Sequence, residues 1–200
     1  MRFVASLALA SCLAMAGCAS LTPPQQASLA EVHALIDTTS RAYGLRPIYV
    51  LVGNAVPGVG GTYRGGMITV STPMLLSRHR DSVIAHELGH YVLGHEAPVG
   101  GGSALEMARA QERRELDANA KAVEILTRSG RTEAAALRLV YDHLLSFHRA
   151  VKANTTVVPW GHRLPCEEIA DLLVRFPAQR RWTASLECAP AVLDANAAPR

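Results

Sequence analysis

The residues best suited to chemistry are His86-Glu87-Leu88-Gly89-His90, an HExxH pattern inside an apolar stretch. Histidines at positions i and i+4 of an α-helix lie on one face, so both imidazoles can bind a single metal ion. Glu87 lies about 100° around the helix from His86, where its carboxylate can take a proton from water at that metal. The pattern therefore predicts metal-assisted hydrolysis.

The flanking residues predict that this pattern lies on a helix. Asp81 or Ser82 can serve as the N-cap, and Gly94 fits the helix end. The alternative is a buried helix whose histidines bind carbonyl groups, but burying two histidines and a glutamate without such a purpose is costly. The apolar residues at helical spacing are Val83, Ile84, Leu88 and Val92.

A catalytic zinc site needs a third protein ligand and keeps a fourth position for water. His95 lies about 140° around a continuing helix from His90, so we expect it beside the site and not as a ligand. A second helix, opened by a capping box at residues 103–106, carries Glu115, which is the predicted third ligand. Glu112, one turn earlier on the same face, is the alternative.

Asn119 lies one turn beyond Glu115 on the same predicted face. Its side chain can accept a hydrogen bond from the non-coordinating ring nitrogen of a ligand histidine, which would fix the orientation of the ring. Small residues on this face allow close approach to another helix, as a shared metal requires. The face comprises Ala108, Glu112, Glu115, Asn119, Ala122 and Leu126.

A HELGH helix followed by a Glu-x-x-x-Asn helix resembles the gluzincin metallopeptidases, especially the group related to the CAAX prenyl protease and the bacterial heat-shock and envelope quality-control peptidases. The resemblance implies one zinc ion (Zn²⁺) and an α+β, zincin-like, mostly helical single domain with a small sheet beside the HExxH helix. Asn54-Ala55 and the segment 162–169 resemble further elements of that group, which implies a place for His162 near the metal. The group usually has Asp where this chain has Asn119, whereas a related group of regulatory proteases that cleave phage-type repressors often has Asn.

The first residues indicate export. Residues 1–17 have a charged start and a short apolar run, which is typical of a signal peptide. Met15-Ala16-Gly17-Cys18 resembles the bacterial lipobox, which implies a lipid on Cys18. We therefore expect a protein anchored in the bacterial envelope, on the outer membrane facing the periplasm, with residues 18–28 as a tether.

The mature chain is expected to form one metallopeptidase domain over residues 29–192, followed by a flexible tail over residues 193–200. Cys166 and Cys188 are the even pair left in an exported chain, which predicts a disulfide. The net charge of +3 is small and the basic residues are scattered, so no nucleic-acid groove is predicted.

The remaining pattern predicts a small sheet among several helices. Residues 58–66 are rich in glycine but lack the ending of a phosphate loop, and we expect them to form a flexible hairpin beside the active cleft. Ala97 to Gly102 joins the two metal-binding helices and could act as a lid. The predicted elements are helices over 29–43 and 132–151, a short helix capped by Thr72 before Pro73, and strands over 48–52 and 67–71.

These residues together predict a zinc-dependent endopeptidase that hydrolyses envelope or periplasmic proteins, with Glu87 as the base. The residue that stabilises the oxyanion is left open among His162, His148 and Tyr141. The expected partners are a polypeptide substrate and, through the N-terminal lipid, a membrane. The alternatives are a zinc-stapled client-binding or outer-membrane assembly factor, and a peptidoglycan amidase.

Overall fold

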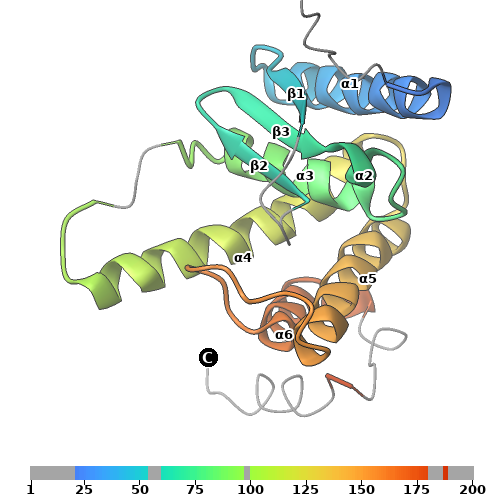
Figure 1. Ribbon diagram of the computed structural model, residues 1–200. Coiled ribbons are helices and arrows are strands. Elements are labelled where there is room, and N and C mark those ends of the chain that lie inside the picture. Colours follow the sequence, from blue (N-terminus) through green and yellow to red (C-terminus); the bar gives the residue numbers. More distant parts are fainter. Residues whose placement is uncertain (1–20, 54–59, 97–99, 180–186, 189–200) are drawn as a thin grey trace, which may run out of the picture.

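A computed structural model describes residues 21–53, 60–96, 100–179 and 187–188 (Figure 1). The fold is mostly helical with a small mixed sheet of three strands, which fits the expected α+β class. The predicted signal peptide, Cys18, Asn54-Ala55, residues 97–99 of the expected lid and the C-terminal tail lie outside the described residues. In chain order the elements are α1 (Pro23–Tyr43), β1 (Tyr49–Gly53), β2 (Gly61–Arg64), β3 (Met67–Ser71), α2 (Thr72–Leu75), α3 (Arg80–Val92), α4 (Ala104–Arg128), α5 (Glu133–Lys152), α6 (Pro165–Arg175) and the 3-10 turn η1 (Pro177–Gln179).

The sheet has the strand order β1-β3-β2, with β1 parallel and β2 antiparallel to the central strand. The central strand β3 has the predicted bounds, and its Ile68 and Val70 are fully buried. The predicted hairpin is in part a strand, β2, which turns into β3 through Gly65 and Gly66 at φ 57° and 77°. Two consecutive residues with positive φ suit a tight hairpin whose twist matches the strands.

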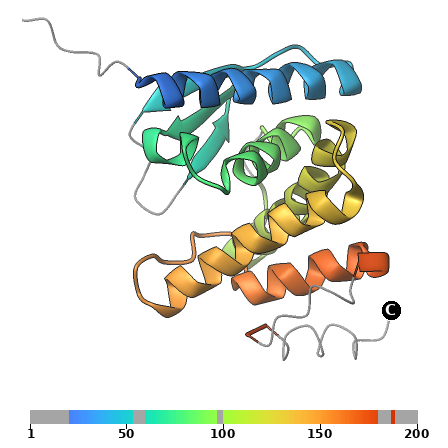
Figure 2. The ribbon, with the colours of Figure 1, turned by 90° about the vertical axis from the view of Figure 1, so that its right-hand side faces the viewer.

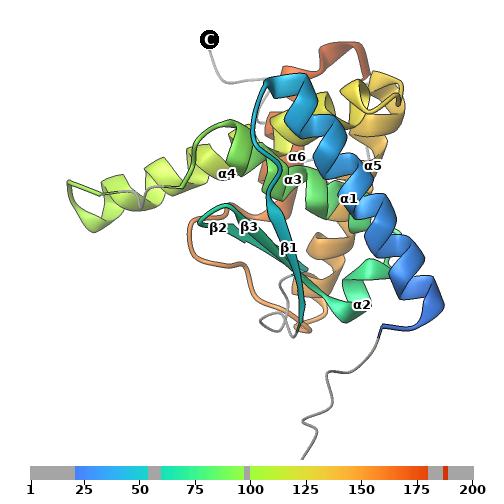
Figure 3. The same cartoon turned by 90° about the horizontal axis from the view of Figure 1, so that it is seen from above.

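The helices and the sheet are arranged in layers. Figures 1 and 2 show α1 at one end of the molecule, the sheet and α3 beneath it, then α4 and α5, with α6 at the opposite end. Helix α3 packs against β2, α1, α4 and α5, so it is the centre of the domain. The first half of α4 projects beyond the rest of the fold (Figure 3). The fully buried side chains come from most of these elements and include Ile36, Ile68, Leu75, Ile84, Leu88, Ile125, Leu126, Leu137, Ile169, Leu172 and Leu173.

Three predictions of helix starts are wrong. Residues 23–28 are part of α1 and not of a tether, because Pro23 occupies the first helical position and Thr22 N–H donates to Gln25 Oε1 at 2.8 Å. Helix α3 begins at Arg80, ahead of the expected caps Asp81 and Ser82.

The side chains of those two residues are engaged elsewhere. Asp81 pairs with Arg80 at 2.7 Å, and Ser82 donates to the His79 carbonyl at 3.0 Å. Short helix α2 is capped by Ser71, which accepts from Met74 N–H at 3.3 Å, so Thr72 is already inside it.

The capping box of α4 is confirmed, with Ser103 N–H donating to Glu106 Oε2 at 2.7 Å. Cys166, at the start of α6, is bonded to Cys188 in a disulfide. Within the described residues, no helix combines the length and apolar character needed to cross a membrane.

Candidate metal centre

The close packing of α3 on α4 determines the geometry of the site. Gly89, inside the HExxH segment, faces α4 so closely that a Cβ at this position would lie 2.8 Å from the carbonyl oxygen of Ala118. Because glycine has no Cβ, the two helix backbones can approach at this point. This approach brings His86 and His90 on α3 to Glu115 on α4.

Three donor atoms from these residues form a nearly equilateral triangle. His86 Nε2 lies 3.1 Å from His90 Nε2 and 3.1 Å from Glu115 Oε2, and His90 Nε2 lies 3.2 Å from the same oxygen. Ligands at the usual zinc bond lengths of about 2.0–2.2 Å in a tetrahedron are about 3.3–3.6 Å apart. The triangle is therefore compatible with a metal ion such as zinc.

The protonation of the triangle supports cation binding. Burial raises the pKa of Glu115, but its hydrogen bonds and charge interactions with His86 and His90 hold that pKa well below its usual range. Burial lowers the pKa of His86, yet the hydrogen bond and charge of Glu115 outweigh it and raise the pKa to about 9. A metal cation bound to this carboxylate displaces the histidine proton.

Neighbouring side chains orient the histidines. His86 Nδ1 lies 2.9 Å from Asn119 Oδ1, an atom that can only accept, so Nδ1 donates to it, and Nε2 is the nitrogen that binds the metal once the metal displaces its proton. His95 Nδ1 lies 3.0 Å from His90 Nδ1, beside the site as expected.

Of the two candidate ligands on α4, only Glu115 reaches the histidines. Its second oxygen, Oε1, accepts from Gln111 Nε2 at 2.6 Å. Glu112 points elsewhere and pairs with Arg163 at 3.3 Å.

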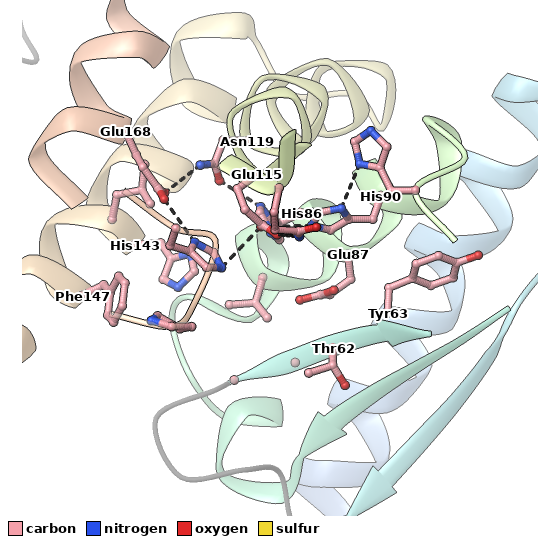
Figure 4. Close-up of a pocket in the computed structure, with 18 residues that line it drawn as sticks. Thr62, Tyr63, His86, Glu87, His90, Glu115, Asn119, His143, Phe147 and Glu168 are labelled. Carbon is pink, nitrogen blue, oxygen red and sulfur yellow. Dashed lines mark hydrogen bonds and ion pairs between the residues drawn. The ribbon is translucent and has the colours of Figure 1, made fainter. Parts of the chain in front are cut away.

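Glu87 lies beside the triangle and faces strand β2 (Figure 4). It is 8% exposed. Burial raises its pKa, while the charges of His86 and His90 and a backbone hydrogen bond from Tyr63 oppose the shift, and the raised value prevails. A carboxylate with a raised pKa is a better proton acceptor near neutral pH.

A cavity of about 360 Å³ opens in front of these residues. Strand β2 forms one wall, and the loop before α6 together with one face of α5 forms the opposite wall. The cavity presents polar groups that can act on a substrate, and it presents apolar surface that can hold a substrate side chain. The lining includes Gly61, Thr62, Tyr63, Val83, Gln111, His143, Leu144, Phe147, Pro159, His162 and Glu168.

Among the three candidates for the oxyanion donor, only His162 lines this cavity. Its Nε2 lies 3.4 Å from Glu115 Oε2, and its ring stacks 6.5 Å from that of His86. Burial lowers the pKa of His162, but the hydrogen bond of Glu168 and the charges of Glu115 and Glu168 raise it overall. Tyr141 is buried in the core, and His148 Nδ1 lies 3.4 Å from Cys166 Sγ, next to the disulfide.

Two cavity residues were missed by the sequence reasoning. His143 lies on the face of α5 that lines the cavity, in line with Val140 and Phe147. Burial and the charges of nearby histidines lower its pKa to about 3, so it is neutral. Glu168 is 2% exposed and lies on the apolar face of α6 with Pro165, Ile169 and Leu172, a spacing that could have identified it.

A second group of possible metal ligands consists of His148, Cys166 and Cys188, with donor atoms within 4.8 Å of one another. The disulfide occupies both sulfurs, and thiolates are the form in which cysteine binds metal. This group therefore fits a metal less well than the triangle on α3 and α4.

Comparison with known proteins agrees with this geometry. The family model Peptidase M78, described as the IrrE N-terminal-like domain, matches residues 54–159, which include the whole of α3, α4 and α5. Searches of curated proteins and of solved structures each returned no match. The matched range contains all three atoms of the triangle and Glu87, but not Glu168.

Proposed function

The chain belongs to the IrrE N-terminal-like family of peptidases, and from this premise we propose that it is a zinc-dependent endopeptidase that hydrolyses proteins of the bacterial cell envelope. The observation that carries the proposal is the triangle of His86, His90 and Glu115 atoms, 3.1–3.2 Å apart, with the buried carboxylate of Glu87 beside it. A structural metal site has no use for a base in that position.

A zinc ion held by His86, His90 and Glu115 would lower the pKa of water and polarise the substrate carbonyl. Glu87 takes the proton from the attacking water and returns it to the leaving amine. His162 faces the cavity with Nε2 and can donate to the carbonyl oxygen as negative charge develops there. Donors of this kind contribute on the order of 3 kcal/mol to catalysis.

Strand β2 supports binding of an extended peptide. It pairs with β3 on one side, and within the described residues no other strand pairs with its second side. Gly61, Thr62 and Tyr63 of this edge line the cavity. Unpaired backbone N–H and C=O groups at a sheet edge can bind a substrate as an added strand.

The proposed location rests on the sequence alone. The charged start, the apolar run and the lipobox-like residues ending in Cys18 support export, lipid attachment and a place on the outer membrane facing the periplasm. Substrates would then be envelope or periplasmic polypeptides. A regulatory role, in which one or a few proteins are cut, is the narrower form of the same activity.

The test compares cells that carry the full-length wild type with cells that carry Glu87→Gln. Mass spectrometry of new protein N-termini in the envelope should find sites that depend on the wild type and vanish with Glu87→Gln, although that variant retains zinc. Glu124→Gln is a matched control, because Glu124 is an exposed carboxylate on α4 paired with Lys121.

The other outcomes each reject the proposal. If cells with Glu87→Gln grow as well as cells with the wild type, and neither sample contains new protein N-termini, the protein is a client-binding factor. A change in peptidoglycan fragments without new protein N-termini would indicate an amidase.

A further inference from the structure

Glu168 links two parts of the site that lie far apart in the sequence. Its carboxylate is 2% exposed and each oxygen has its own partner. Oε2 accepts from Asn119 Nδ2 at 3.0 Å (Figure 4). Oε1 lies 3.1 Å from His162 Nδ1. Among the described residues, the ion-pair partner found for Glu168 is His162, so no lysine or arginine balances this buried charge.

One branch of this contact reaches the metal triangle. Because Asn119 donates Nδ2 to Glu168, its Oδ1 faces His86 Nδ1 at 2.9 Å. The orientation of the Asn119 amide thus keeps a proton on His86 Nδ1, so Nε2, which faces Glu115 and His90, is the nitrogen left to bind the metal. Glu168 determines that orientation although it touches no member of the triangle.

The other branch reaches the cavity. The second oxygen of Glu168 accepts the Nδ1 proton of His162, which fixes the ring so that Nε2 faces the cavity and Glu115. A rotation of this ring would remove the proposed donor from the substrate carbonyl. A single carboxylate therefore orients both the ligand side and the substrate side of the site.

We propose that Glu168 is a positioning residue that holds Asn119 and His162 in the orientations used by the metal triangle and the cavity. The proposal rests on the proposed function, since it assigns these orientations to a metal centre. It also explains why Asn stands at position 119. An Asp there would place a second carboxylate about 3 Å from Glu168 in a buried site, where like charges repel strongly.

The arrangement allows an exchange of the two side-chain types. In Glu168→Gln alone, the single Gln oxygen can accept from only one of Asn119 Nδ2 and His162 Nδ1, so either Asn119 loses its acceptor or His162 Nδ1 must give up its proton. In Asn119→Asp alone, two carboxylates face each other. In the double variant Asn119→Asp/Glu168→Gln, Asp accepts from His86 and from the new Gln, whose oxygen accepts from His162, so every bond has a donor and an acceptor.

The experiment measures zinc affinity of the full-length protein in detergent by competition with a chromogenic chelator, with the visible spectrum of the cobalt(II) form as a second readout. We expect each single variant to bind zinc about 10–100-fold more weakly, as for other partners of metal ligands. The double variant should recover most of that loss and the wild-type cobalt spectrum. Asp171→Asn, a carboxylate-to-amide change on α6 that removes only a pair with Arg175, should retain wild-type affinity.

Wild-type zinc affinity in Glu168→Gln would overturn the proposal, as would a folded double variant whose loss equals the sum of the single losses. If Glu168→Gln does not fold, the double variant decides, because it is expected to fold and to bind zinc. No peptide substrate enters these measurements. A wild type that binds zinc but cleaves nothing contradicts the proposed function, whereas unchanged affinity in the variants contradicts only the role of Glu168.

Discussion

Replacing Gly89 by alanine tests whether the approach of α3 to α4 builds the metal triangle. The added Cβ would lie 2.8 Å from the Ala118 carbonyl oxygen, whereas ordinary contacts begin near 3.4 Å. The obstacle is backbone, which cannot rotate away as a flexible side chain can. In a close-packed interface the two helices must therefore separate by about 0.6 Å.

Two opposing effects set the magnitude for stability. Alanine favours a helix over glycine by about 1 kcal/mol, while overpacking costs about 1–3 kcal/mol. The free energy of unfolding should thus fall by about 0–2 kcal/mol. Zinc binding should suffer more, since ligand distances tolerate shifts of only about 0.2 Å, and we expect at least about a tenfold loss of affinity, which corresponds to about 1.4 kcal/mol.

The assay is a zinc competition titration together with thermal unfolding of the zinc-free protein. Gly53→Ala is the matched control, because a Cβ on Gly53 meets nothing within 4 Å and its zinc affinity should not change. A Gly89→Ala protein that binds zinc as tightly as the wild type and unfolds at a higher temperature would show that the close approach at Gly89 does not set the ligand distances, since helix propensity alone would then account for the change.

Further predictions concern protons and the disulfide. The pKa of His86 is raised from 6.5 to about 9, so zinc must displace a proton from this residue when it binds. The apparent zinc affinity should therefore rise about tenfold per pH unit between pH 6.5 and about pH 9 and level off above that value. A zinc affinity that does not depend on pH would contradict this prediction. The raised pKa stabilises the zinc-free fold fully below pH 6.5 and this contribution is lost as pH rises through about 9, so chelated protein should resist urea better at pH 6.5 than at pH 9. The disulfide between Cys166 and Cys188, which lie 22 residues apart, should contribute about 3 kcal/mol to the free energy of unfolding. Urea unfolding of the wild type and of a variant with both cysteines replaced by serine measures this difference. Alkylation of both cysteines in native protein without reductant would show that the bond is absent.

Much of the fold could be predicted because several elements carry local signals. The central strand β3 alternates half-buried and fully buried residues, and Ser103 and Glu106 form a capping box, so short-range patterns sufficed for both. Strand β2 was missed because Gly61-Thr62-Tyr63-Arg64 has a weak β pattern, and its pairing with β3 depends on the turn at Gly65-Gly66. Residues 23–28 look like a linker until Pro23 is placed at the first helical position.

The site divides in the same way. His86, Glu87 and His90 have a fixed spacing on one helix, and Glu115 with Asn119 follows from one helix face. His143 and Glu168 reach the cavity only through the tertiary packing of α5 and α6, although the apolar spacing of α6 marks Glu168 as a residue on a buried face. The sequence therefore predicts the groups next to the metal better than the groups that hold them in place.

The most direct test of the central claim is a crystal structure of the zinc-loaded protein with anomalous data collected at the zinc absorption edge. We expect one strong anomalous peak within bonding distance of His86 Nε2, His90 Nε2 and Glu115 Oε2. A zinc-loaded crystal with no peak there, or with the peak beside His148, Cys166 and Cys188, would contradict it.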